Sequence, residues 1–482
     1  MNLLNQNPPR GAKNYALAGE KCLWILTEER PKKEVLQMIF DYFAKDQNIG
    51  YFGGELKIIP ILDESKCFDF TYEVIGFTCN RVNRVFIKTV SGNSSFTDFL
   101  IYYQNEIPTP DQEPLYAIEE TKTDDKESRN TGVFQRCSKF VYIQNFFPNT
   151  KKIMLYALQV EQKEEPTETY IFGTRLLLTL GVEILGKRLD PKIFIPFKTV
   201  DEIIQAKNSM RRPPAGNVPI LLEKKGDTIT VSGRLYKSGS LSHDPNIGAL
   251  TIIGAALRNV GWRGKIVVVN HGLLQQHVRS GKNKFILIAN KIGMSLYGLK
   301  MPRPIMPKDY WHYDMDGEKL GTIFIHLVVE NFTESFSIFE NHAGCEKGYF
   351  KTPNGEHIPL AKYTDRDAYK AGDKDQIINI PDLVLIDISE KESITIEGKK
   401  YENKLNGIAE LAGYDAFEHL YLKKYYPAFK VVRTVVLYGS YEERIIEIEV
   451  GFMLNKEGKL VLGVKAPKLF TRAINNLLSY WA

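Results

Sequence analysis

The stretch from Phe96 to Lys122 contains two carboxylates and a lysine that could form one site, Asp98, Glu120 and Lys122. Residues 98–103 have the composition of a strand, and a second strand-like run ends in Glu120-Thr-Lys122. Side chains alternate between the faces of a strand, so Glu120 and Lys122 should share a face, and strand pairing should place Asp98 beside Glu120. Paired carboxylates bind hard divalent ions such as Mg²⁺, and a lysine adds a cation near the attacked phosphate. The stretch therefore predicts a metal-dependent phosphodiesterase.

The same pattern recurs in residues 376–404. Pro381 and Asp382 open a strand, a polar turn follows, and the partner strand ends in Glu397-Gly-Lys399. Each copy is followed by a helix-like segment and then a strand-like segment. After the first copy, the helix-like segment is 133–147 and the strand-like segment is 151–160. After the second copy, they are 405–426 and 429–439. The recurrence predicts two candidate centres.

This order of elements resembles the PD-(D/E)xK nuclease superfamily and, within it, the type II restriction endonucleases. The resemblance implies that the catalytic residues are Asp98, Glu120 and Lys122 in the first half and Asp382, Glu397 and Lys399 in the second. It also implies that the Asp and Glu of each copy bind Mg²⁺, while the lysine orients or deprotonates the attacking water. The first copy departs from the pattern because Thr97 precedes its Asp. An acidic residue on the preceding helix often assists in this family, and Glu34 is the candidate here.

The implied fold is α/β (mixed α+β), with two nuclease-like cores, each a central mixed β-sheet flanked by helices. A helix is predicted at 33–46, and the β-branched run at 319–330 is predicted to be a strand. The two prolines and the glycine of 210–219 predict a linker. We expect an N-terminal nuclease-like domain at 1–207, a linker at 208–218 and a C-terminal domain at 219–482. Within the last, 219–370 would recognise DNA and 371–482 would form the second core.

Composition is that of a globular protein, with 43% hydrophobic and 25% charged residues in 482. The net charge of +5 suits a polyanionic partner without requiring one. Five scattered cysteines indicate neither a disulfide framework nor a zinc ribbon and fit a reducing cytoplasm. The start of the chain does not resemble a secretory signal, and Arg175 and Glu183 interrupt the longest apolar run, so no membrane span is expected.

Cations and amides on several segments could contact DNA. Candidates for phosphate contacts are Arg129, Arg136, Arg211, Arg212, Arg279 and Lys282, and candidates for reading base edges are Asn270, His271 and Gln275. For each of them, a solvated polar turn is the competing interpretation.

Two further clusters are less specific. The run from Glu340 to Lys347 contains His342 and Cys345, but a nucleophile and its base usually come from distant parts of a chain, so a structural or DNA-contacting loop is favoured. Residues 314–318 (DMDGE) lack the remaining ligands of a calcium loop and predict a turn. The chain has no phosphate-binding G-x-x-x-x-G-K-[ST] motif, which argues against an ATP-driven translocase.

Taken together, the residues and the resemblance predict a Mg²⁺-dependent, sequence-specific endonuclease acting on double-stranded DNA. The preferred interpretation is one centre for each strand, and the alternative is one active copy beside a degenerate one, in a protein that dimerises or cuts twice. It would be a monomer or a homodimer, and a cognate methyltransferase would act on the same DNA site. The alternatives are a non-catalytic DNA-binding protein on a nuclease-like scaffold and a low-specificity nuclease of repair or mobile-element type.

Overall fold

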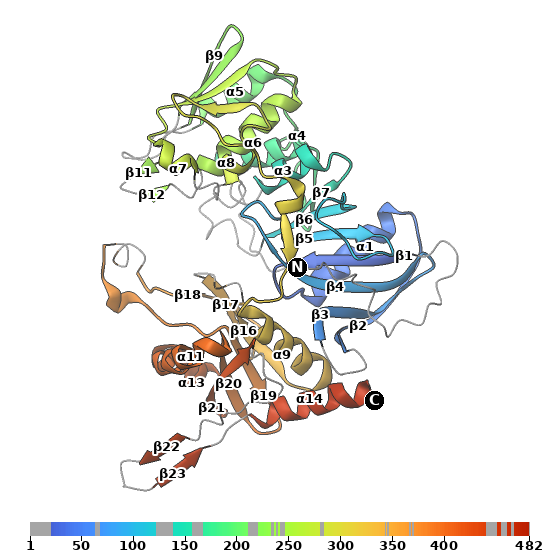
Figure 1. Ribbon diagram of the computed structural model, residues 1–482, viewed down its shortest axis with the longest axis vertical. Helices are drawn as coiled ribbons and strands as arrows, with labels where there is room; N and C mark the ends of the chain where they lie inside the picture. Colours follow the sequence, from blue (N-terminus) through green and yellow to red (C-terminus); the bar gives the residue numbers. More distant parts are fainter. Residues whose placement is uncertain are drawn as a thin grey trace, which may run out of the picture.

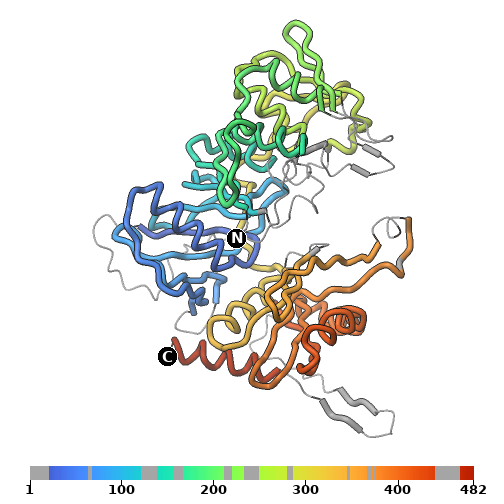
Figure 2. The backbone as a smooth tube through the Cα atoms, turned by 180° about the vertical axis from the view of Figure 1, so that it is seen from behind, coloured from blue at the N-terminus to red at the C-terminus, as the bar shows by residue number. Residues whose placement is uncertain are grey.

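The computed structural model describes residues 21–62, 68–121, 138–156, 167–210, 220–232, 236–237, 240–241, 246–279, 284–342, 344, 347–365, 368, 371–439, 451–454, 460–463 and 467–481. Its N-terminal sheet lies in the middle of an elongated molecule (Figure 1). The middle of the chain forms one end, and the C-terminal part forms the other, as the view from behind also shows (Figure 2).

The N-terminal sheet has nine strands. They are β1 (Lys21–Thr27), β2 (Tyr51–Leu62), β3 (Phe68–Cys79), β4 (Val82–Gly92), β5 (Phe99–Tyr103), β6 (Tyr116–Thr121), β7 (Lys151–Tyr156), β8 (Val182–Leu185) and β15 (Trp311–Tyr313). The order is β2-β3-β4-β1-β5-β6-β7-β8, with β15 paired to β4. Helix α1 (Lys33–Asp46) packs on one face, and α3 (Lys139–Phe146) and α4 (Glu168–Thr179) pack on the other.

The middle segment packs against α3 and α4. It contains α5 (Val200–Ser209), β9 (Leu221–Lys225), β10 (Thr228–Ser232), β11 (Tyr236–Lys237), β12 (Ser240–Leu241), α6 (Asn246–Asn259), β13 (Lys265–Val269), α7 (Gln275–Arg279), α8 (Lys284–Ile288) and β14 (Met294–Leu296). One hydrophobic core joins Phe140 and Leu176 of the N-terminal part to Ile253 of α6. The expected linker lies in α5 at residues 208–209, and its residues 211–218 lie outside the described part of the chain.

The C-terminal part is built on a four-stranded sheet, β16 (Phe336–Glu340), β19 (Leu383–Asp387), β20 (Glu392–Lys400) and β21 (Lys430–Tyr438), in the order β16-β19-β20-β21. Helices α9 (Lys319–Phe332) and α14 (Lys468–Tyr480) cover one face. A helical segment interrupted by 3-10 and π turns, with α11 (Lys404–Leu411), α12 (Asp415–Phe417) and α13 (Lys423–Tyr425), follows β20 and packs through Phe417 and Leu422 on the other face. Two small hairpins, β17 (Lys347–Lys351) with β18 (His357–Ala361) and β22 (Gly451–Leu454) with β23 (Leu460–Gly463), complete it.

The two sheets share a four-strand arrangement. In β1-β5-β6-β7 and in β16-β19-β20-β21, the first two pairs are antiparallel and the last pair is parallel. In both, a helical segment connects the last two strands. The chain is therefore a mixed α+β protein, as the sequence predicted. None of the helices in its described ranges combines the length and the hydropathy needed to cross a bilayer.

The prediction of a strand at 319–330 is wrong, because these residues form the helix α9. Ile323 and Leu327 join the core of the N-terminal sheet, whereas Val328 and Val329 join the core of the C-terminal sheet. A helix buried on two sides carries apolar residues all around, and a run rich in β-branched residues then has no 3.6-residue period to distinguish it from a buried strand.

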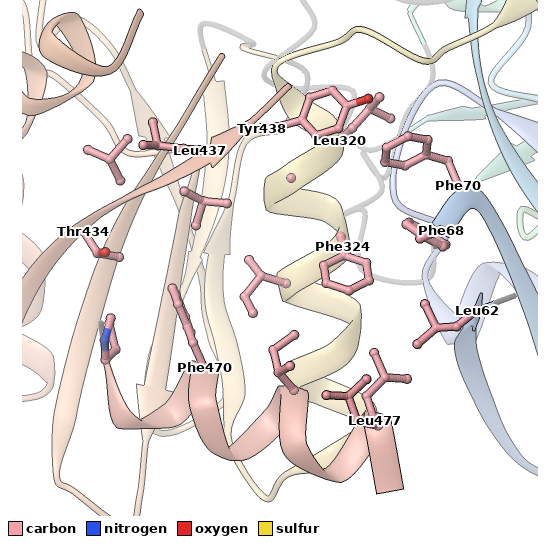
Figure 3. A pocket seen from close by; sticks show the side chains of 17 residues that line it. Leu62, Phe68, Phe70, Leu320, Phe324, Thr434, Leu437, Tyr438, Phe470 and Leu477 are labelled. Atoms are coloured by element: carbon pink, nitrogen blue, oxygen red, sulfur yellow. The ribbon is translucent and has the colours of Figure 1, made fainter. Parts of the chain in front are cut away.

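An apolar cavity of 640 Å³ lies beside α9, where the two sheets approach one another (Figure 3). Its lining combines side chains of the first sheet with those of α9, β21 and α14, including Leu62, Phe68, Phe70, Leu320, Phe324, Thr434, Leu437, Tyr438, Phe470 and Leu477. Aromatic contact across it, between Phe68 and Phe324, joins the two halves of the chain.

Helix α14 offers a matched pair of leucines for testing this packing. Leu477 is 1% exposed in the core under the C-terminal sheet, and its neighbour Leu478 is 38% exposed. We expect Leu477→Ala to lower the free energy of unfolding by about 2–5 kcal/mol, because it leaves a buried void, and Leu478→Ala to lower it by about 1 kcal/mol or less. Urea unfolding followed by fluorescence measures both, and equal effects would contradict the placement of α14.

Candidate active sites

Asp382 and Glu397 lie opposite one another on the β19–β20 pair. The pairing of Leu383 with Ile396 sets this register, and the Asp382 N–H donates to the Ile396 carbonyl at 3.0 Å. The Gly398 N–H donates to Asp382 Oδ2 at 2.9 Å. A Cβ atom at Gly398 would lie 2.7 Å from Thr322 and 3.3 Å from Asp382 Oδ2, so glycine lets the strand approach α9 closely.

Lys399, the lysine expected at the second centre, contacts Glu397. Its Nζ lies 2.8 Å from Glu397 Oε1 and 3.0 Å from Oε2 of Glu410 on α11. The Tyr414 hydroxyl donates to Glu397 Oε2. The spacing of the motif gave no indication of Glu410 and Tyr414, and the only signal in the sequence was their position in the helical segment after the second copy.

The carboxylates of the second centre resist ionisation. Burial raises the pKa of Asp382 to about 6, against the opposing effects of the Gly398 N–H and Lys399. Burial and then the charge of Asp382 raise the pKa of Glu397 to about 7. Burial disfavours the charge of Lys399, but its contacts with Glu397 and Glu410 raise its pKa overall. A divalent cation between Asp382 and Glu397 would stabilise both negative charges.

The first centre has the same register but a different glutamate. Phe99 pairs with Ile118, so Asp98 lies opposite Glu119, and the Asp98 N–H donates to Glu119 Oε2 at 3.3 Å. The Glu120 N–H donates to Asp98 Oδ2 at 2.8 Å, as the Gly398 N–H does to Asp382. Glu119 thus corresponds to Glu397.

The sequence predicted Glu120 as the neighbour of Asp98, but the structure places Glu119, one residue earlier, at that position. Alternation along β6 puts Glu120 on the face of Ile118, which packs with α1, and Glu119 on the face of Ala117, which packs with α3. Thr121 holds the position that corresponds to Lys399, and Lys122 lies outside the described residues.

A lysine from α3 reaches the first centre. Lys139 Nζ lies 2.8 Å from Glu119 Oε2 and 3.3 Å from Asp98 Oδ1. The contact between lysine and glutamate has the same length in both centres, 2.8 Å, although one lysine comes from a helix and the other from a strand. Nothing in the spacing of the sequence indicated Lys139.

Glu28, after β1, is the acidic residue beside the first centre. Burial raises its pKa, and the nearby charge of Asp98 acts in the same direction, while the Gly92 N–H and two lysines oppose them. Glu34, the residue expected in this role, lies in the first turn of α1 and acts electrostatically on Arg30. The structure thus places Glu28 near Asp98, whereas Glu34 acts on Arg30.

Two consecutive residues at the start of α9 connect the centres. Lys319 Nζ donates to the main-chain carbonyl of Glu28 at 2.5 Å. The main-chain carbonyl of Glu318 lies 3.3 Å from the position of a Cβ at Gly398. Chain dimensions then place Gly398 and Glu28 within about 20 Å of one another.

Three of the residues predicted to contact DNA have side chains that the structure describes, and all three form hydrogen bonds within the protein. The Asn270 amide donates to the Ser232 hydroxyl, and His271 bonds the Tyr297 carbonyl and accepts the Leu273 N–H. Gln275 exchanges two hydrogen bonds with the main chain of Lys300. These three side chains therefore stabilise the conformation of the segment between β13 and α7. The six candidates for phosphate contacts lie outside the residues or side chains that the structure describes. They are Arg129, Arg136, Arg211, Arg212, Arg279 and Lys282.

A buried polar cluster lies where β1 leads into α1 and contacts α9 and β16. Arg30 bonds Glu330 at 2.8 Å and Glu340 at 2.7 Å. Burial opposes the charge of both glutamates, but His326 and Arg30 lower the pKa of Glu330, and Arg30 and Lys32 lower that of Glu340. His342, from the reactive run noted in the sequence, joins this cluster, and Cys345 lies outside the described residues.

Comparisons of the chain with protein-family models, curated proteins and solved structures found no match. The resemblance to nucleases therefore depends on the motif residues and on the geometry of the two centres.

The raised pKa of Glu397 makes the folding stability of the metal-free protein depend on pH. Because this pKa, about 7, lies above the value of about 4.3 in an unfolded chain, the stability it contributes is complete below pH 4 and is lost as the pH rises through 7. We expect Glu397→Gln, which mimics the protonated side chain, to raise the thermal midpoint in EDTA at pH 8 and to change it little at pH 5. Glu356→Gln, at an exposed turn, should have no effect at either pH. A midpoint lowered at pH 8 would contradict the assignment.

Proposed function

We propose that this chain is a Mg²⁺-dependent endonuclease that hydrolyses phosphodiester bonds of double-stranded DNA, in the manner of type II restriction endonucleases. The observation that carries the proposal is the opposition of Asp382 and Glu397 across a strand pair, with Lys399 in contact with the glutamate. Two nuclease-like cores are part of the proposal, and the matching strand arrangements support them.

The donors of the second centre fit Mg²⁺, since they are carboxylate oxygens, which this hard ion prefers. Asp382 and Glu397 would hold the ion, which supplies stabilisation of the charge that develops on the scissile phosphate. Glu410 holds the Lys399 amine beside Glu397, where it can orient the attacking water. The Tyr414 hydroxyl fixes Glu397 Oε2 and so sets the direction in which Oε1 points.

The first centre would act on the other strand. Asp98 and Glu119 are its carboxylates, and Lys139 is its lysine. The short path through Glu318 and Lys319 supports simultaneous contact of both centres with one duplex. One chain would then cut both strands without forming a dimer.

The glutamates give the sharpest test of the two-centre hypothesis. On supercoiled plasmid with Mg²⁺, wild type should produce discrete linear fragments, and Glu397→Gln and Glu119→Gln should each produce nicked circles, with the nicks on opposite strands. Glu120→Gln is the matched control and should retain double-strand cleavage, because Glu120 belongs to the other face of β6.

Other outcomes decide between the alternatives. Loss of double-strand cleavage in Glu120→Gln but not in Glu119→Gln would contradict the register of the first centre. Smeared fragments from wild type would favour a low-specificity nuclease. Binding of plasmid without cleavage in any divalent ion would favour a DNA-binding protein on a nuclease-like scaffold.

Neighbouring lysines test the second centre separately. Lys399→Ala should lower the rate of its nick by about 10²–10⁴-fold, as expected for loss of a group that orients or activates water. Lys400→Ala should remain within a few-fold of wild type, because Lys400 bonds Asp316 and not the carboxylate pair. Single-turnover cleavage of a labelled duplex measures both rates, and equal losses would exclude a specific role for Lys399.

A further inference from the structure

Three side chains of the cluster beside Arg30 point their donor atoms at one another. His326 comes from α9, Glu340 ends β16, and His342 follows two residues later. His326 Nδ1 lies 2.9 Å from His342 Nε2 and 3.6 Å from Glu340 Oε2, and the third separation, between Nε2 and Oε2, is 4.0 Å. Both imidazoles are almost completely buried.

The size of this triangle matches a metal ion. A circle through three atoms with these separations has a radius of about 2.1 Å, which is the length of a zinc–nitrogen or zinc–oxygen bond. An ion slightly above its centre could approach all three atoms at close to this bond length, and a small widening of the 2.9 Å separation between the two nitrogens would bring the angles toward tetrahedral. The fourth tetrahedral position would remain for water.

The outer nitrogen of each histidine already has an acceptor, as in protein zinc sites. His326 Nε2 lies 3.1 Å from Glu330 Oε1, and His342 Nδ1 lies 3.2 Å from Thr322 Oγ1. The Thr322 hydroxyl donates to the Lys319 carbonyl at 2.9 Å, so its oxygen can accept from His342. With both outer nitrogens protonated, the two inner nitrogens present lone pairs to the centre of the triangle.

The hydrogen bonds of the two histidines can also be completed without an ion. If the Thr322 hydroxyl turns its hydrogen to His342 Nδ1, His342 Nε2–H donates to His326 Nδ1. The two states differ by a hydroxyl rotation and the tautomer of one histidine. Accepting the ion therefore needs only this proton shift and a small separation of the two imidazoles.

The surrounding charges balance. Arg30 and Lys32 face Glu330 and Glu340, so the cluster with neutral histidines carries no net charge. The Glu340 oxygen that faces the triangle also accepts from Arg30 Nε at 2.7 Å, as metal-bound carboxylates commonly accept a further hydrogen bond. Two imidazoles and one carboxylate select a zinc-type ion over Mg²⁺.

We propose that His326, His342 and Glu340 form a site for one zinc-type divalent cation, separate from the two Mg²⁺ centres. The ion ties α9 to the end of β16, next to the Arg30 contact that links the C-terminal part to the N-terminal sheet. Its effect is on the stability of this junction.

Metal content of the untagged full-length protein tests the proposal. After treatment with EDTA and dialysis against Zn²⁺, wild type should retain one zinc per chain by mass spectrometry, and His342→Ala should retain none. His357→Ala, at an exposed position at the start of β18, should retain one, as should Glu397→Gln in the second Mg²⁺ centre. Equal zinc in wild type and His342→Ala, or no zinc in wild type, overturns the proposal.

A variant outside the triangle separates metal binding from folding. Thr322→Val removes the acceptor of His342 and keeps the three ligands, so zinc affinity should fall about 10–100-fold. Because the metal-free protein also loses its hydrogen bond to His342 Nδ1, its thermal midpoint should fall, and zinc affinity is therefore measured on folded protein below that midpoint. Zinc should also raise the midpoint of wild type but not of His342→Gln, which serves if the alanine variant does not fold. Unchanged affinity in Thr322→Val together with an equal zinc response in His342→Gln excludes the site.

Discussion

The burial of α9 between two sheets is the constraint on which the rest of the structure depends. Ile323 and Leu327 belong to the core of the N-terminal sheet, and Val328 belongs to the core of the C-terminal sheet. The helix therefore fixes the position of one sheet relative to the other. Its first residue, Lys319, bonds the main chain of Glu28 beside the first centre, and the carbonyl of the preceding Glu318 lies near Gly398 of the second. The packing of a single helix therefore also sets the separation between the two centres.

Buried carboxylates occur in two electrostatic settings. Glu330 and Glu340 lie against Arg30, and their pKa values are lowered despite burial. Asp382 and Glu397 lie against one another, and their pKa values are raised to about 6 and about 7. A fixed guanidinium stabilises the first pair permanently, whereas the second pair gains most from a cation that arrives from solution. This contrast distinguishes carboxylates with a structural role from those suited to a dissociable ion.

The motif residues of the second centre could be predicted from the sequence because Asp382, Glu397 and Lys399 come from one strand pair with a short turn. The first centre was harder, since the long excursion between β5 and β6 leaves the strand register open, and a shift of one residue exchanges Glu120 for Glu119. Contacts made across the fold, such as that of Lys139, have no local signal. The helix α9 was mistaken for a strand because burial on two sides removes its periodicity.

The strand β15 has a consequence for the order of events during synthesis. Trp311 pairs with Gly92 at the end of β4, and Tyr310 stacks on Tyr142 of α3 with ring centroids 4.2 Å apart. Both late residues are completely buried in the N-terminal core. At about 5–20 residues per second, a ribosome needs roughly 10–40 s to add the residues between Gly92 and Trp311. Until then the nascent N-terminal sheet leaves part of its apolar surface uncovered, and transiently exposed apolar surface favours aggregation.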